Sequence, residues 1–173
     1  MILTPRLRLR ALAAHDLALF RALYCDAKIM RHIGKPMTSA DARASLRATL
    51  AAARKSDGPR FFVIAERKSR RGVGLCSHRP AAWRKGDVEL GLMLVPRAHG
   101  RGYAREALQA LIRMAFFQLR AKAVWVQYRR ANVRMARLCE AAGFEAESSQ
   151  HPARGCVRML RRSEMGNQSN QLA

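Results

Sequence analysis

The sequence is poor in acidic residues and has no long apolar run. Its 173 residues include 12 Asp and Glu against 33 Lys and Arg, a net charge of +21. No apolar run approaches the about 18–20 residues that a membrane-spanning helix requires. Arg6, Arg8 and Arg10 stand where a secretory signal peptide would have its apolar centre. We therefore expect a cytoplasmic protein that does not bind membranes.

Cysteine is scarce and dispersed. The chain has 4 cysteines, Cys25, Cys76, Cys139 and Cys156, and no two of them form a CxxC pair. Both a zinc site and a disulfide framework need closer or more regular spacing. We expect reduced thiols, as in a cytoplasm, and no bound metal.

Aromatic residues make up only 6% of the chain and do not alternate with the arginines. A surface that stacks nucleic-acid bases needs aromatic or planar side chains at regular intervals. Two interpretations of the charge stay open. The arginines are a compositional bias and solvated, or they bind a polyanion such as RNA or the ribosome. We favour the first, with weak and non-specific polyanion binding.

A basic glycine turn lies between a strand-like and a helix-like segment. The apolar run Val88–Val95 ends at Pro96, the turn follows as RAHGRG, and an amphipathic segment begins at Tyr103. Such a turn leaves backbone N–H groups unpaired at the positive end of a helix, which suits an anion. Gly100 and Gly102 would let the backbone approach a phosphate closely.

Three kinds of phosphate-binding loop compete for this turn. A P-loop needs Gly-Lys-Ser/Thr after its second glycine, which is absent. A dinucleotide fingerprint needs a third glycine, where Arg105 stands, and a later acidic residue. The acyl-CoA turn R/Q-x-x-G-x-G/A is filled in register by Arg97, Gly100 and Gly102.

The sequence after this turn has a matching order of elements. Asn132 can cap a helix that ends near Gly143, with a strand beginning at Phe144. The apolar positions of that helix recur at i, i+3, i+4 and i+7, at Met135, Leu138, Cys139 and Ala142. This order resembles the GNAT superfamily of N-acetyltransferases. The opening LTPRLRLRAL and the turn's continuation YAREA resemble its ribosomal-protein N-terminal acetyltransferase (RimJ/RimL-like) branch.

The resemblance covers residues 2–162. It implies a single α/β (α+β) domain over 1–162, with a central mixed, mostly antiparallel sheet that is splayed at the acyl-CoA site and flanked by helices. Residues 163–173 are polar, and we expect a disordered tail. The elements expected before the turn are a strand over Ile2–Leu12, a helix capped by Asp16, a loop with Gly34 and Pro36, a helix from Thr38 to about Arg54, and a hairpin of 61–66 with 72–78. A helix over 103–120 follows it, with Ala104, Leu108, Leu111, Ile112, Ala115 and Leu119 on its apolar face. Strands over 123–128, 144–148 and 156–160 come next, the last two joined by a His151-Pro152 loop.

By resemblance, acetyl-CoA is the cosubstrate. Its pantetheine arm would pair with the strand before the turn, and an N–H near Leu92 or Met93 would polarise the thioester carbonyl. The expected cofactor-binding residues are Leu92, Met93, Leu94, Val95, Arg97, His99, Gly100, Arg101, Gly102, Tyr103, Ala104 and Asn132.

Glu89 is the predicted catalytic base. It lies on the same face of its strand as Gly91 and Met93, and a buried acid on an apolar strand requires a reason. A structural ion pair with an arginine is the alternative. Asp87 is expected to be a loop residue, His99 to have a structural or cofactor-facing role in the turn, and His78 to face the cleft or pack in the core.

The chain departs from the family pattern at Met135, where many members have Ser, and at Cys139, where many have a Tyr acid. Cys139 is expected to pack in the core. We therefore predict an acyltransferase that acetylates a primary amine, a protein N-terminus or a small amine, by direct transfer in a ternary complex, as a monomer or homodimer. The alternative is a non-catalytic module that binds CoA or a polyanion.

Overall fold

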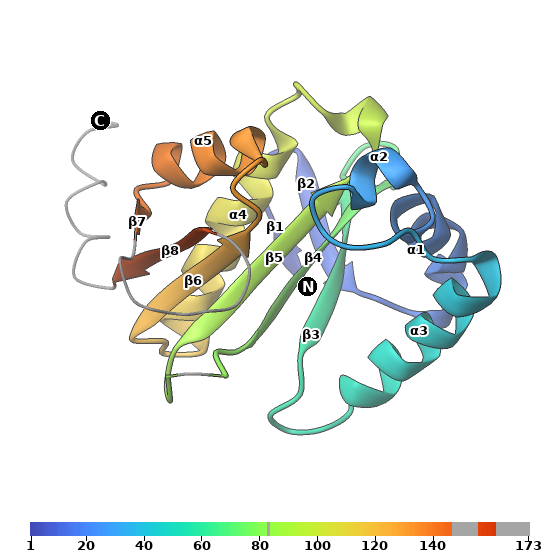
Figure 1. The fold of residues 1–173 in the computed structure, drawn as a ribbon. Coiled ribbons are helices and arrows are strands. Elements are labelled where there is room, and N and C mark those ends of the chain that lie inside the picture. The colour runs from blue at the N-terminus through green and yellow to red at the C-terminus, as the bar shows by residue number, and fades with distance from the viewer. Residues whose placement is uncertain (83, 147–155, 162–173) are drawn as a thin grey trace.

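Eight strands form one sheet in the part of the chain that the structure describes (Figure 1). The structure is a computed structural model, and it describes residues 1–82, 84–146 and 156–161. The strands are β1 (Ile2–Leu3), β2 (Leu7–Ala11), β3 (Arg60–Glu66), β4 (Gly72–Pro80), β5 (Val88–Leu94), β6 (Ala123–Tyr128), β7 (Glu145–Ala146) and β8 (Cys156–Arg161). Their order in the sheet is β1-β2-β3-β4-β5-β6-β8-β7.

The sheet is mostly antiparallel and opens between β5 and β6. These two strands run parallel, and they pair only over Val88–Leu90 and Val124–Val126. Beyond Leu90, β5 continues to Leu94 while it stays paired with β4 on its other side. The predicted fold class and the predicted splay are therefore both confirmed.

Five α-helices flank the sheet within the described residues. They are α1 (Leu17–Tyr24), α2 (Ala27–Met30), α3 (Ser39–Ala52), α4 (Tyr103–Arg113) and α5 (Val133–Ala141). Figure 1 shows α1 and α3 together on one side of the sheet and α4 on the other. None of the described helices is long and apolar enough to cross a membrane.

The core lies between the sheet and these helices, and it follows the sequence periodicity. Leu7 and Leu9 of β2 are fully buried, whereas the alternate Arg8 and Arg10 are half-buried. This alternation is what a strand with one face on the core requires. On α4, residues three and four apart such as Leu108 and Leu111 are fully buried against the sheet.

Three details of the N-terminal part of the chain differ from the prediction. The strand expected over Ile2–Leu12 is broken into β1 and β2 at residues 4–6, which contain Pro5. Asp16 occupies the N-cap position of α1, as predicted, but its side chain makes no capping hydrogen bond; its carboxylate accepts hydrogen bonds from Arg10 and from the Ala13 N–H. The loop expected around Gly34 contains α2, whose first N–H groups are capped by the Asp26 side chain.

The helix expected over 103–120 does not keep one helical period. A π-helical turn over Met114–Gln118 follows α4. Because such a turn holds more residues than an α-turn, it rotates the apolar positions that follow. Leu119, predicted to be inward, is 42% exposed, and Phe117 is 66% exposed. The predicted tail at 163–173, the loop at His151-Pro152 and the end of the strand expected over 144–148 lie outside the described residues.

Candidate functional site

A cleft of about 470 Å³ opens where β5 and β6 separate. Strands β4, β5 and β6 form its walls, and Tyr24 of α1, His32 after α2 and Asn132 before α5 also line it. Among the predicted site residues, Glu89, Leu92, Met93 and Asn132 meet here. Leu94 and Val95 are buried, and residues 97–104 form the turn after β5 and the start of α4.

The open edge of β5 carries free backbone groups. In an antiparallel ladder, alternate residues bond to the neighbouring strand. The N–H of Val95 bonds to the Val73 carbonyl, and the β4–β5 register is constant. The backbone groups of Met93 therefore point to β4, and those of Leu92 point into the opening. Of the two predicted oxyanion donors, this geometry favours the Leu92 N–H.

The turn after β5 presents further unpaired N–H groups. Gly100 and Gly102 have φ angles of 72° and 75°, a backbone region that other residues rarely adopt. The first backbone bond of α4 joins the Glu106 N–H to the Gly102 carbonyl. Among the described residues, no hydrogen bond forms from the N–H groups of Gly100–Arg105. The turn thus has donors for an anion at a helix N-terminus.

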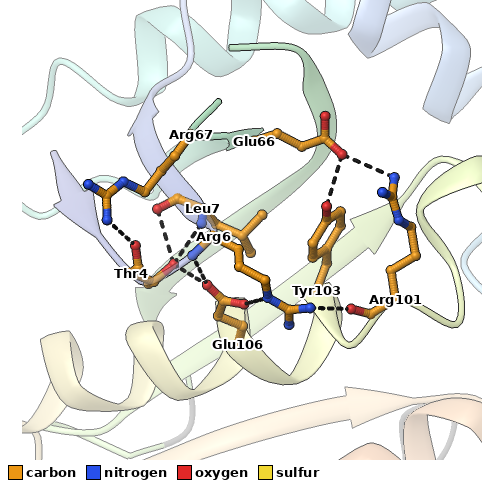
Figure 2. Close-up of polar contacts among 8 residues, drawn as sticks. All are labelled: Thr4, Arg6, Leu7, Glu66, Arg67, Arg101, Tyr103 and Glu106. Atoms are coloured by element: carbon orange, nitrogen blue, oxygen red, sulfur yellow. Dashed lines mark hydrogen bonds and ion pairs between the residues drawn. The ribbon is translucent and has the colours of Figure 1, made fainter. Parts of the chain in front are cut away.

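The N-terminal segment fixes this turn from outside (Figure 2). The carboxylate of Glu106 accepts hydrogen bonds from Thr4 Oγ1 (2.6 Å), from the Arg6 N–H (2.7 Å) and from Arg6 Nε (2.7 Å). Arg6 Nη1 also donates to the Arg101 carbonyl at 2.8 Å. Glu106, near the start of α4, is therefore an ion-pair partner of Arg6, and it ties the segment between β1 and β2 to the turn.

Side chains of the turn are engaged with the protein itself. Arg101 pairs with Glu66 at 3.1 Å, and Tyr103 donates its hydroxyl to the same Glu66 oxygen at 2.9 Å. Arg97 donates to the Gly72 carbonyl at 3.1 Å. The backbone N–H groups of the turn are therefore available to an anion. Arg97 and Arg101 could bind it only after their contacts with Gly72 and Glu66 break.

His99 links the turn to β5 and α5. Its Nε2 lies 3.1 Å from the Leu94 carbonyl, which requires the proton on Nε2. Its Nδ1 lies 3.4 Å from Arg134 Nη1 of α5. His99 thus hydrogen-bonds the Leu94 carbonyl on the open edge of β5, and it links β5 to α5, the two elements that border the opening.

Asn132 and α5 form the other border of the opening. Asn132 caps α5, because its Oδ1 accepts the Met135 N–H at 3.2 Å, and it also lines the cleft. Gly143 ends the helix region with a φ angle of 78°. Cys139 is fully buried, and burial raises the pKa of its thiol to about 12. The predicted capping and the predicted core position of Cys139 are confirmed.

Glu89 lines the cleft but has a partner. Arg79 on β4 lies directly opposite and holds both carboxylate oxygens, at 2.6 and 3.0 Å. The Glu89 side chain is 11% exposed and that of Arg79 is 58% exposed. Each carboxylate oxygen keeps a second lone pair, so the pairing leaves Glu89 able to accept a further hydrogen bond.

Asp87 and His78 lie away from the cleft. Asp87 is 4% exposed and accepts the Trp125 Nε1–H at 2.7 Å, so it anchors the start of β5. His78 is 9% exposed and stacks on Phe62. Burial, and then the charge of Arg60, lower the pKa of His78. Of the two expectations for His78, packing in the core is the observed one.

Sequence analysis missed Tyr128, the last residue of β6. It lines the cleft, and its hydroxyl oxygen accepts a hydrogen bond from Arg158 Nε at 2.7 Å. That guanidinium is held in turn by Glu140 of α5 at 2.6 Å. Burial raises the pKa of Tyr128 and Arg158 opposes this, so the phenol keeps its proton at neutral pH. Its O–H proton is free to point into the cleft and could protonate a leaving thiolate.

Tyr128→Phe tests this role. We expect turnover to fall about tenfold, which is less than general acid catalysis usually contributes, because a thiolate leaves without much help. The loss should be similar at every pH below the raised pKa of the phenol. The measurement is thiol release across pH 6–9, with acetyl-CoA affinity and the melting curve as controls. Full activity in the variant would remove Tyr128 from the chemistry.

The functional residues come from distant parts of the chain, and no described group of three or more His, Cys, Asp or Glu could hold a metal ion.

The profile of the family described as acetyltransferase (GNAT) domain matches residues 6–145. A comparison with curated protein sequences finds no match.

Solved structures share the fold over nearly the whole chain. An acetyltransferase (GNAT family) from Bacillus anthracis is 20% identical, with a TM-score of 0.80 over 94% of this chain and 99% of that one. A candidate ribosomal-protein-serine acetyltransferase from Vibrio cholerae is 22% identical, with a TM-score of 0.75 over 92% and 96%. Spermidine N-acetyltransferase from Vibrio cholerae, in complex with CoA and spermine, is 21% identical, with a TM-score of 0.78 over 93% and 98%.

Proposed function

This chain belongs to the GNAT acetyltransferase family, and from that premise we propose that it transfers an acetyl group from acetyl-CoA to a primary amine. The single observation that carries the proposal is that unpaired backbone groups on the edge of β5 are followed along the chain by unpaired N–H groups in the turn. The N–H groups of Gly100–Arg105 suit a pyrophosphate, and the free edge of β5 at Leu92 suits the amides of pantetheine.

The residues of the cleft supply the remaining steps. Glu89 takes a proton from the acceptor ammonium, directly or through water, because only the free amine is a nucleophile. The amine nitrogen bonds to the acetyl carbon, and the Leu92 N–H stabilises the charge on the carbonyl oxygen. As the C–S bond breaks, the nitrogen loses its second proton to solvent and becomes an amide. The thiolate takes the Tyr128 proton, and solvent returns a proton to the phenolate while Glu89 releases its own.

The burial of Cys76 and Cys139 favours direct transfer within a ternary complex. Cys76 lines the cleft, but it is 1% exposed, and burial raises the pKa of its thiol. Cys139 is buried with a pKa of about 12. A thiol is a nucleophile only as the thiolate. Neither residue is therefore suited to carry the acetyl group as a covalent intermediate.

The acceptor is a protein N-terminus or a small amine. The fold is shared by a structure described as a ribosomal-protein-serine acetyltransferase and by a spermidine N-acetyltransferase. The resemblance of the N-terminal segment to the RimJ/RimL-like branch favours a protein N-terminus. The test is thiol release with a panel of peptide N-termini and small amines at saturating acetyl-CoA. Release with at least one amine, at a rate well above acetyl-CoA hydrolysis, is expected. Acetyl-CoA binding without release would assign the chain to a non-catalytic module.

The net charge of +21 favours a second candidate, a module that binds RNA or the ribosome. We expect instead weak binding to RNA that falls steeply with salt and that heparin competes away equally well. Fluorescence anisotropy with a labelled RNA at two salt concentrations measures this. A nanomolar complex that is selective for one RNA at physiological salt would support the second candidate.

A further inference from the structure

Basic side chains outnumber acidic ones among the described residues that line the cleft. Among its described lining residues, Glu89 is the one carboxylate, and Arg79 already holds both of its oxygens. Arg129 and His32 also line the cleft. An acceptor with several positive charges would therefore find no free carboxylate in the described lining.

Arg129 stands in a cluster of like charges. Arg129 follows β6 directly, and its Nη1 donates to the backbone carbonyl of Arg31 at 3.1 Å. We call Arg31, His32 and Arg129 the rim of the cleft, because His32 and Arg129 line it and Arg31 contacts both. Arg31 Nε in turn donates to His32 Nε2 at 3.0 Å. Burial, then Arg31 and Arg129, lower the pKa of His32, so the imidazole is neutral and can accept this bond.

No described carboxylate neutralises this cluster. The ion pairs of the described residues join Arg6, Arg10, His15, Arg79, Arg101 and Arg158 to acids, and neither Arg31 nor Arg129 is among them. Cations near a cleft that no described acid neutralises favour the binding of an anion. A planar guanidinium group binds a carboxylate through two parallel hydrogen bonds.

We propose that the acceptor is an amine with carboxylates close to it, such as the N-terminus of an acidic peptide, and that Arg129 and Arg31 bind those carboxylates. This inference rests on the proposed function. The amine would lie near Glu89 and its acidic groups near the rim. A polyamine, like the spermine bound in the Vibrio cholerae structure, is the kind of acceptor that such a rim disfavours.

The test compares acceptors that differ only in charge. The peptide amides Ser-Asp-Glu-Gly, Ser-Gln-Gln-Gly and Ser-Lys-Arg-Gly, together with spermidine, are assayed by thiol release at saturating acetyl-CoA. We expect kcat/KM to be at least about tenfold higher for the acidic than for the basic peptide at low ionic strength, and the ratio to shrink as salt is added.

Two variants separate the rim from the charge of the whole protein. Arg129→Glu should reverse the preference, because it replaces a rim cation with an anion. Arg113→Glu makes the same change of charge on an exposed residue of α4 outside the cleft, and it should keep the preference. Equal loss of preference in both variants would overturn the role of the rim.

The remaining outcomes distinguish the two proposals. If the basic peptide or spermidine is acetylated as fast as the acidic peptide, the inference about the acceptor is wrong and the acetyltransferase function stands. If no amine in the panel releases thiol, the proposed function is contradicted and the inference falls with it.

Discussion

Gly102→Val is expected to abolish the rise in melting temperature that acetyl-CoA gives the parent protein. A ligand that binds only the folded state at a hundred times its dissociation constant stabilises it by about 2.7 kcal/mol, or about 5–10 °C for a chain of this size. Gly102 has a φ angle of 75°, and a Cβ there would lie 3.0 Å from Arg6 Nη2. A branched side chain would disturb the turn and the Arg6 contacts that hold it in place. The N–H groups of the turn would then no longer point toward one anion.

The variant also strains the fold, so it needs a matched control. Gly86, in the loop before β5, has a φ angle of 90°, and a Cβ there would meet only the Lys122 side chain at 3.6 Å or more. Gly86→Val should therefore lower the melting temperature of the free protein but keep the shift with acetyl-CoA. Differential scanning fluorimetry measures both. A full shift in Gly102→Val would show that the turn does not bind the cosubstrate.

Glu89→Gln is expected to lower turnover tenfold or more while acetyl-CoA affinity stays nearly intact. Gln keeps the size of Glu and can still accept a hydrogen bond from Arg79, but it does not take up a proton. The loss should be largest at low pH, where the acceptor amine is protonated, and should shrink as pH rises and free amine forms. A residue that only positions the substrate would show a loss that does not depend on pH.

Glu145→Gln is the control for the lost charge, because Glu145 lies on β7, exposed and outside the cleft. It should leave the pH profile unchanged. The melting curve of Glu89→Gln must match that of the parent, since the Arg79–Glu89 pair also joins β4 to β5. If Glu89→Gln is as active as the parent at every pH, Glu89 is a structural residue, and solvent or another group deprotonates the amine.

Local sequence patterns predicted the elements whose conformation is decided locally. The glycine turn, the Asn132 cap, Gly143 and the apolar face with Cys139 all depend on residues within one or two turns of each other. The apolar run Val88–Val95 predicted a strand, whereas the splay of the sheet was predicted only from the family resemblance. The π-helical turn at Met114–Gln118 has no comparable local signal, which is why Leu119 was placed wrongly.

Contacts between distant residues could not be predicted. The partner of Glu89 is one of 33 basic residues, and only the register of β4 with β5 selects Arg79. The ion pair that holds the turn joins Arg6 to Glu106, 100 positions away. Tyr128 is likewise recognisable only once β6, β8 and α5 bring it together with Arg158 and Glu140.

The most direct test of the central claim follows the acetyl group itself. Protein is mixed with acetyl-CoA labelled in the acetyl group and an acidic peptide amide, and single turnovers are quenched with acid. We predict that the label appears on the peptide amino group at the rate of thiol release, with none on the protein at any time. Label on the protein before the peptide would contradict direct transfer, and bound acetyl-CoA that never loses its label would contradict the enzyme.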